Sequence, residues 1–151
     1  MTVREDRELR LPPRPASVRE SRSFVRSVLG SWGLPGLCDD AGLLVSELAS
    51  NAVVHAGTPL TLTVSWRRGT NRVRVTVHDE STVPPRLRAH DVGATAGRGL
   101  QIVTAVADAS GVVRTGTGKD VWFELEPDAG THGRDRAAVP GGSPSMCPRL
   151  R

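Results

Sequence analysis

Residues 39 to 57 read DDAGLLVSELASNAVVHAG, and their apolar positions recur with the period of an α-helix. Asp39 or Asp40 suits the N-cap, and Gly57 suits the left-handed position that ends a helix. We therefore expect a helix of roughly 16 residues between them. Its core-facing stripe is expected to contain Ala41, Val45, Leu48, Ala52 and Ala56.

A carboxylate and an amide stand one helical turn apart on this segment. Glu47 and Asn51 share a face of the expected helix, and that face is not the apolar stripe. Pairs of this kind are also common on a solvated face, where they have no function. The choice between a functional site and a solvated surface therefore depends on the other motifs of the chain.

The length of 151 residues allows one well-packed domain but not two. We expect a disordered N-terminus over residues 1 to 6 and one folded domain over residues 7 to 126. Residues 127 to 151 are rich in glycine, proline and arginine without any period, so we expect a disordered tail.

The net charge of +4 does not by itself indicate nucleic-acid binding. The segment after Pro127 holds four arginines and two aspartates, and no basic stripe interleaved with aromatic residues occurs elsewhere. No long apolar run or secretory leader pattern occurs either, so we expect a cytoplasmic protein without nucleic-acid or membrane partners. Cys38 and Cys147 lack the close spacing of a zinc site or a disulfide framework, so we expect reduced thiols.

The segment before residue 39 predicts one strand and one helix. Leu9 and Leu11 alternate with a polar residue before two prolines, which is typical of a short edge strand. Ser17 and Glu20 have the spacing of a capping box, and an amphipathic helix is expected from there to Gly33. Its apolar positions are Val18, Val25, Val28, Leu29 and Trp32.

After Gly57 the apolar period changes to two, which predicts two half-buried strands. Their inward positions are Leu60, Leu62, Val64 and Trp66, then Val73, Val75 and Val77. Asp79 follows on the same inward face. Burying a carboxylate costs several kcal/mol unless it is compensated, so Asp79 needs a partner, for which a ligand is one candidate. The alternative is that Asp79 ends the strand and turns into solvent or caps a turn.

Residues 81 to 97 show no apolar period and end in a glycine-rich run. Gly97 and Gly99 precede Leu100, where a short helix is expected to begin. Such a loop before a helix N-terminus presents free backbone N–H groups to an anion such as phosphate. The alternative is a flexible loop without a ligand. We expect residues 84 to 97 to form a lid over the site.

Two more strands are expected to close the fold, one from Val112 and one containing Val121, Phe123 and Leu125, with a turn over residues 115 to 118. The predicted order is strand, helix, helix, two strands, long loop, short helix and two strands. This order predicts an α/β fold, a two-layer α/β sandwich with a mixed, mostly antiparallel sheet and the helices on one face.

In its sequence motifs the chain resembles the GHKL ATPase superfamily, which includes the nucleotide-binding domains of gyrase and histidine kinases. Within it, the chain is most similar to the single-domain anti-sigma-factor serine/threonine kinases and their actinobacterial relatives. The resemblance covers roughly residues 7 to 126 and is carried by SELASNAVVHAG, VTVHDES, GRGLQIV and GKDVWFEL.

The resemblance implies ATP and Mg²⁺ as cofactors. It implies that Asn51 coordinates the Mg²⁺ that bridges the phosphates and that Glu47 is the general base. It also implies that Asp79 accepts the exocyclic amine of adenine. The phosphates would be held at the helix N-terminus by Gly97, Arg98, Gly99 and Leu100.

Three further residues are expected near this site. His55 lies one turn beyond the amide and would line the site; the alternative is a partly buried histidine near the helix end. Thr117 would approach the adenine and Lys119 the phosphates; the alternative is a surface turn. The family's adenine motif continues as D-x-G-x-G, whereas Asp79 is followed here by Glu80, Ser81, Thr82 and Val83, without either glycine.

The resemblance therefore implies an anti-sigma-factor serine/threonine kinase, which binds a sigma factor and phosphorylates an anti-sigma-factor antagonist. The missing glycines leave open whether kinase activity is retained. The alternatives are a nonenzymatic nucleotide-binding partner-switching adaptor and the detached ATPase domain of a histidine kinase. A homodimer is left open as well.

Overall fold

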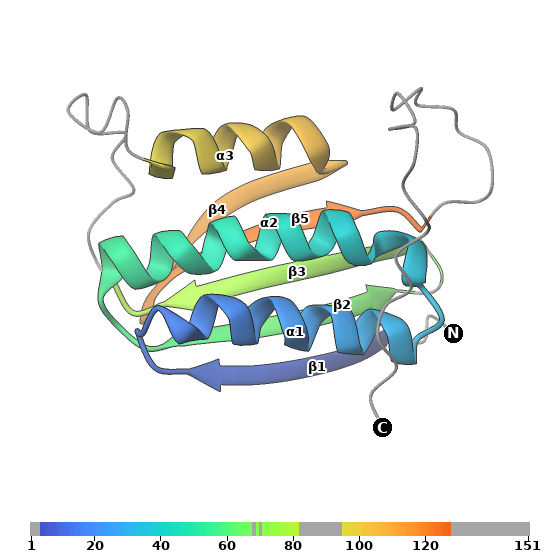
Figure 1. Cartoon of the computed structure of the whole chain (residues 1–151), viewed down its shortest axis with the longest axis horizontal. Helices are drawn as coiled ribbons and strands as arrows, with labels where there is room; N and C mark the ends of the chain where they lie inside the picture. The colour runs from blue at the N-terminus through green and yellow to red at the C-terminus, as the bar shows by residue number, and fades with distance from the viewer. Residues whose placement is uncertain (1–3, 68, 70, 82–94, 128–151) are drawn as a thin grey trace.

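The computed structural model describes residues 4–67, 69, 71–81 and 95–127 (Figure 1). Its elements are β1 (Arg4–Leu11), α1 (Ala16–Ser31), a 3-10 turn (Pro35–Leu37), α2 (Cys38–Asn51), a π-helical turn (Ala52–Ala56), β2 (Leu60–Arg67), β3 (Arg72–Asp79), α3 (Thr95–Val106), β4 (Ala109–Thr115) and β5 (Gly118–Leu125). The predicted order of elements is confirmed.

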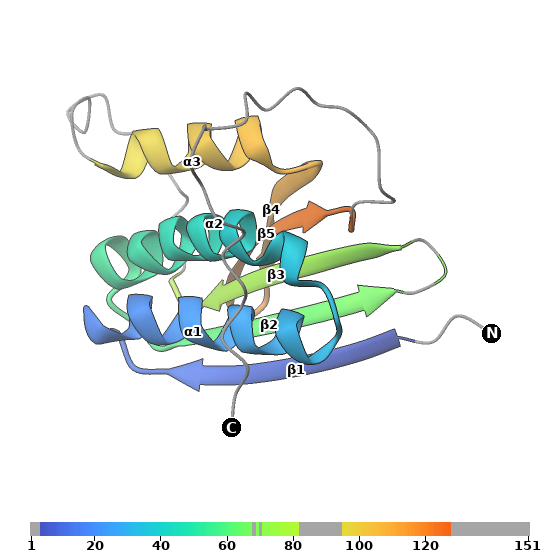
Figure 2. The same ribbon diagram turned by 45° about the vertical axis from the view of Figure 1, so that its right-hand side comes forward.

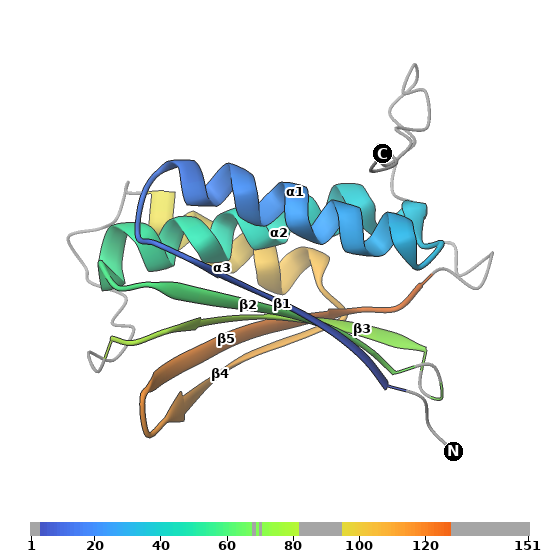
Figure 3. The same cartoon turned by 90° about the horizontal axis from the view of Figure 1, so that it is seen from below.

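The five strands form one sheet in the order β1-β2-β3-β5-β4, so β3 is the central strand. Each neighbouring pair is antiparallel. Figure 3 shows that α1, α2 and α3 all lie on one face of the sheet. The two-layer α/β sandwich is therefore confirmed, with an antiparallel rather than a mixed sheet in the part of the chain that the structure describes.

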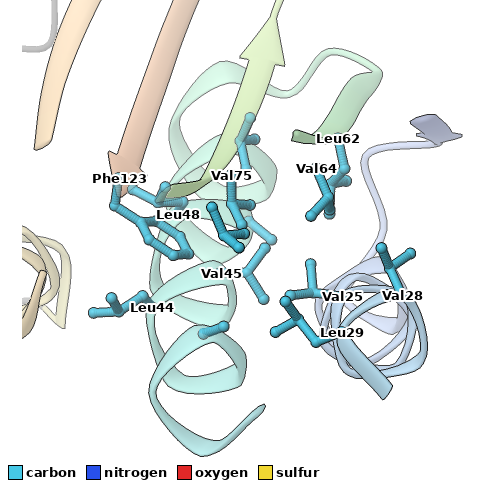
Figure 4. Close-up of a cluster of buried hydrophobic side chains, with 14 of the residues drawn as sticks. Val25, Val28, Leu29, Leu44, Val45, Leu48, Leu62, Val64, Val75 and Phe123 are labelled. Carbon is cyan, nitrogen blue, oxygen red and sulfur yellow. The ribbon is translucent and has the colours of Figure 1, made fainter. Parts of the chain in front are cut away.

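The core lies between this sheet and the helices (Figure 4). α2 occupies the middle of the helical layer and packs against α1 on one side and α3 on the other. The predicted stripe, which runs along α2 and into the π-helical turn, faces the core, except that Ala56 is only half-buried. The central side chains are at most 2 % exposed and comprise Val25, Leu29, Leu44, Val45, Leu48, Leu62, Val64, Val75 and Phe123.

The start of α2 differs from the prediction. Neither Asp39 nor Asp40 is the N-cap, because the preceding 3-10 turn runs directly into the helix and places Leu37 at that position without a side-chain cap. Both aspartates instead lie in the first turn, where a negative charge is favourable at the positive end of the helix. Asp39 also pairs with Arg26 at 3.3 Å.

The end of this helical segment agrees with the prediction. The helix is followed by the π-helical turn Ala52–Ala56, which keeps the chain helical for five more residues. Gly57 then ends the segment in the left-handed region, with φ of 62°. The position of this glycine fixes where the chain leaves the helical layer and returns to the sheet.

The N-terminal elements begin earlier than predicted. β1 starts at Arg4, so residues 4 to 6 pair with β2 and are not part of a disordered N-terminus. An edge strand this rich in charge has too few apolar residues for alternation to reveal it. α1 starts at Ala16 with Pro15 at the N-cap, so Ser17 does not cap the helix, and its hydroxyl donates to the Pro12 carbonyl.

β4 also begins earlier than predicted, at Ala109 instead of Val112. Glycine has a low strand propensity, so Gly111 interrupts the sequence pattern and the strand was predicted to begin only after it. The predicted turn over residues 115 to 118 is confirmed, with Thr115 paired to Gly118. The predicted tail lies outside the described residues beyond Pro127.

Two expectations concern the cysteines and membranes. Cys38 is fully buried and disulfide-bonded, so the expectation of a reduced thiol is wrong at this position. Cys147 lies outside the described residues. No helix in the described ranges is both long and apolar enough to cross a membrane.

Neighbouring leucines on α2 provide a test of this packing. Leu44 is fully buried, whereas Leu43 is 44 % exposed. We expect Leu44→Ala to lower the free energy of unfolding by about 2–5 kcal/mol, because it leaves a cavity between helix and sheet. Leu43→Ala should cost less than about 1 kcal/mol, because little apolar area is lost there. Urea unfolding measures both, and equal losses would contradict the orientation of α2.

Candidate functional site

Four segments that carry the predicted site residues meet at one end of the molecule. Figures 1, 2 and 3 agree in showing there the C-terminal end of α2, the end of β3, the start of α3 and the turn between β4 and β5. Because neighbouring strands are antiparallel, β3 returns to the end at which the helical segment left for β2. Residues that are far apart in the sequence are thus gathered at this end.

Asp79 lies on the inward face of β3, as predicted, and is only 2 % exposed. Its Oδ1 accepts a hydrogen bond of 3.0 Å from the Ser81 backbone N–H, which is the geometry of an Asx turn. The carboxylate therefore does cap a turn, as one alternative held, but it does not turn into solvent. The cost of burying it has to be met locally.

Lys119 provides the opposite charge. It lies beside Asp79 in the register of β3 and β5, and its Nζ is 3.7 Å from Asp79 Oδ2. The Lys119 side chain is only 13 % exposed, so it does not belong to a solvated surface turn. Its observed partner is Asp79, and an approach to phosphates remains untested.

Gly118 allows β5 to approach the end of β3. A Cβ at this position would lie 1.9 Å from the Asp79 carbonyl oxygen, and the glycine φ is 154°. No side chain fits here without moving the backbone of one of the two strands. Gly118 therefore sets the distance at which Lys119 meets Asp79.

The end of α2 is connected to the same strand end. The backbone N–H of Glu80 donates to Thr58 Oγ1 at 3.0 Å. Thr58 directly follows Gly57, which ends the helical segment. This hydrogen bond holds the exit from the helical layer against the residue after Asp79.

Glu47 and Asn51 are both half-buried, on the side of α2 away from its core stripe, as predicted. Asn51 is the last residue of α2, so it lies at the end where the four segments meet. In the described part of the chain neither side chain makes a hydrogen bond or ion pair. His55 lies one turn later in the π-helical turn and is exposed, so it is not the partly buried histidine of the alternative.

Thr117 is exposed in the turn between β4 and β5. Its Oγ1 lies 3.4 Å from His78 Nε2, and His78 Nδ1 lies 2.6 Å from Asp120 Oδ1. His78 and Asp79 are consecutive strand residues and point to opposite faces of the sheet. The structure therefore brings Thr117 to His78 and not to the Asp79 carboxylate.

The predicted phosphate-binding residues Gly97, Arg98, Gly99 and Leu100 lie within α3, which begins at Thr95. We expected the glycines to precede the helix, but they belong to its first turns. The first four backbone N–H groups of a helix have no intrahelical acceptor, and they include those of Gly97 and Arg98. The predicted lid lies mostly outside the described residues, which resume at Thr95.

Sequence reasoning missed three contributors to this site: Ser81, Thr58 and Gly118. The first two act through a backbone N–H and a hydroxyl that no spacing pattern reveals. The glycine was visible only as part of a turn. Within the described ranges no cluster of three or more His, Cys, Asp or Glu side chains could hold a metal ion.

The close approach at Gly118 can be tested with a matched pair of glycines. We expect Gly118→Ala to lower the free energy of unfolding by more than about 2 kcal/mol, because its Cβ would overlap the Asp79 carbonyl. A Cβ added at Gly116 would meet no atom within 4 Å, so Gly116→Ala should change stability by less than about 1 kcal/mol. Denaturant unfolding of both variants is the measurement, and a neutral Gly118→Ala would contradict this geometry.

Comparisons with known proteins agree with this fold. No curated protein sequence gives a significant match. Among solved structures, the chain is similar to the crystal structure of the RsbU and RsbW domains of Rv1364c from Mycobacterium tuberculosis, with a TM-score of 0.62 and 17% identity. That match covers 81% of this chain and 32% of the other, so the chain spans about a third of its length and the likeness is one of fold. A family model described as a histidine kinase-like ATPase domain matches residues 11–125, and the chain therefore belongs to the histidine kinase-like ATPase domain family.

Proposed function

We propose that this protein is an ATP-dependent anti-sigma-factor serine/threonine kinase, which binds a sigma factor and phosphorylates an anti-sigma-factor antagonist. Family membership supports ATP as the ligand. The observation that carries the proposal is a buried carboxylate, Asp79, at the end where Asn51 and the start of α3 also lie.

The chemistry of Asp79 fits an adenine. An ionised carboxylate only accepts hydrogen bonds and offers about four lone-pair sites, of which the Ser81 N–H uses one. The exocyclic amine of adenine is a donor, so it complements the remaining capacity.

The phosphate end of the nucleotide would be held by Asn51 and by α3. Mg²⁺ prefers oxygen ligands and keeps several waters, so one amide oxygen from Asn51 together with phosphate oxygens suits it. Bound Mg²⁺ supplies charge neutralisation for phosphoryl transfer. The free N–H groups of Gly97 and Arg98 at the positive end of α3 favour an anion.

Glu47 is the proposed general base. It lies one turn before Asn51 on the same side of α2 and is half-buried rather than freely solvated. A carboxylate in this position can take the proton of a serine or threonine hydroxyl that attacks the terminal phosphate. A positioned base of this kind contributes typically about 10²- to 10⁴-fold to the rate.

A nonenzymatic partner-switching adaptor is the second candidate. The observation that favours it is the sequence after Asp79, where Ser81 and Val83 stand in place of the two glycines of the family motif. An adaptor would use the nucleotide to control partner affinity without transferring phosphate. The detached ATPase domain of a histidine kinase is a third and weaker candidate.

The first test is whether Mg·ATP stabilises the fold. Ligand at 100 times its dissociation constant should add about 2.7 kcal/mol to the free energy of unfolding. Asp79→Asn should abolish this gain, because the variant no longer presents an ionised acceptor to the amine. Exposed Glu80→Gln should keep it. Thermal unfolding with and without millimolar Mg·ATP is the measurement, and no shift for the wild-type protein would count against the whole nucleotide site.

The second test separates kinase from adaptor. Glu47→Gln keeps the size of the side chain but removes its basicity, so Mg·ATP affinity should survive while phosphate transfer falls by about 10²-fold or more. Exposed Glu20→Gln on α1 is the matched control and should change neither. Calorimetry and transfer of labelled phosphate to candidate antagonist proteins are measured on the same preparation.

Each outcome of this second test has a defined meaning. Retained transfer in Glu47→Gln would remove Glu47 from the catalytic role. If the wild-type protein captures its partners without transferring phosphate, the adaptor is favoured. Loss of both nucleotide binding and stability would assign Glu47 a structural role.

A further inference from the structure

Lys119 is the only lysine of the chain, and the proposed phosphoryl transfer does not use it. It lies on the inward face of β5 with its side chain 13 % exposed. A long cationic side chain in such a place normally serves a specific partner, because burying an unpaired charge is costly. Its cross-strand neighbour on the other side is Arg114, a like charge, which leaves Asp79 as the group that compensates it.

The distance between the Lys119 ammonium and the Asp79 carboxylate separates an ion pair from a direct hydrogen bond. Lys119 Nζ is 3.7 Å from Asp79 Oδ2, which is within ion-pair range but longer than the usual 2.7–3.2 Å of a hydrogen bond to oxygen. Oδ1 already accepts the Ser81 N–H. Within the described residues, Oδ2 receives no hydrogen bond. The ammonium thus compensates the charge of the carboxylate without using the lone pairs of Oδ2.

We infer that Lys119 is the positioning residue for base recognition. It holds Asp79 as a buried, ionised acceptor and leaves Oδ2 available for the 6-amino group of a purine, so it sets the preference for a 6-aminopurine over a 6-oxopurine nucleotide. Gly118 supports this role, because only a residue without Cβ lets β5 approach Asp79 closely enough. The inference rests on the proposed nucleotide site and specifies the part of the ligand that Lys119 controls.

The test compares Mg·ATP with Mg·ITP, which carries a carbonyl oxygen in place of the 6-amino group. Dissociation constants are measured by calorimetry for the wild-type protein and for Lys119→Met, Lys119→Arg, Asp79→Asn and the double variant Asp79→Asn/Lys119→Met. We expect Lys119→Met to weaken ATP at least about tenfold and ITP by less than about twofold, because only ATP uses the Asp79 acceptor. Lys119→Arg should keep the preference for ATP, and Lys119→Met should have no further effect when Asp79 is already asparagine.

A labelling experiment on the unmodified protein covers the case in which Lys119→Met does not fold. Because the chain contains a single lysine, ¹³C-labelled lysine gives one Cε resonance in the NMR spectrum. This resonance should move when Mg·ATP binds and move less with Mg·ITP. An unchanged resonance with ATP bound would overturn the inference.

The remaining outcomes are also decisive. Equal weakening of ATP and ITP by Lys119→Met would mean that Lys119 serves the phosphates or the fold, and would overturn the inference. Additive effects of the Asp79 and Lys119 substitutions would overturn it as well. If the wild-type protein binds neither nucleotide, the proposed function fails. If it binds ATP but does not respond to changes at Lys119, only the inference fails.

Discussion

Asp79 carries a carboxylate at a position where the three preceding inward residues of β3 are valines. A charge there is costly unless it is compensated, and the compensation comes from groups outside β3. Lys119 supplies the opposite charge and Ser81 a backbone donor. Both depend on how β5 and the chain after β3 run past the end of the central strand. The ion pair therefore constrains the geometry of that end of the sheet.

The hydrophobic core determines where the helical residues of the site lie relative to this pair. Leu48 and Phe123 belong to the buried cluster between α2 and the sheet (Figure 4), and both are almost completely buried. Their packing fixes the rotation of α2 about its axis. Glu47 precedes Leu48 directly, so the same packing that buries Leu48 keeps Glu47 off the core face. The orientation of the proposed base is thus a consequence of core packing and needs no hydrogen bond of its own.

The sequence was sufficient for most of the fold and for the residues whose position follows from periodicity. The inward face of Asp79, the shared face of Glu47 and Asn51, and the end of the helix at Gly57 are all local consequences of periods of two or 3.6 residues. Boundaries that depend on tertiary context were missed. β1 begins at Arg4 because β2 provides a partner, although its own residues are mostly charged. The contact between Lys119 and Asp79 was also missed, because their pairing follows from the register of β3 and β5.

The chain departs from the family motif directly after Asp79, at the end of β3. At the first of the two missing glycine positions stands Ser81, whose backbone N–H donates to Asp79, and the neighbouring Glu80 N–H donates to Thr58. Both lie beside the carboxylate that would read the base. Neither involves Glu47 or Asn51, where the phosphates and the attacking hydroxyl would lie. The missing glycines therefore lie at the end proposed to bind the base, whereas Glu47 and Asn51, the residues proposed for phosphoryl transfer, are positioned by α2 and its packing.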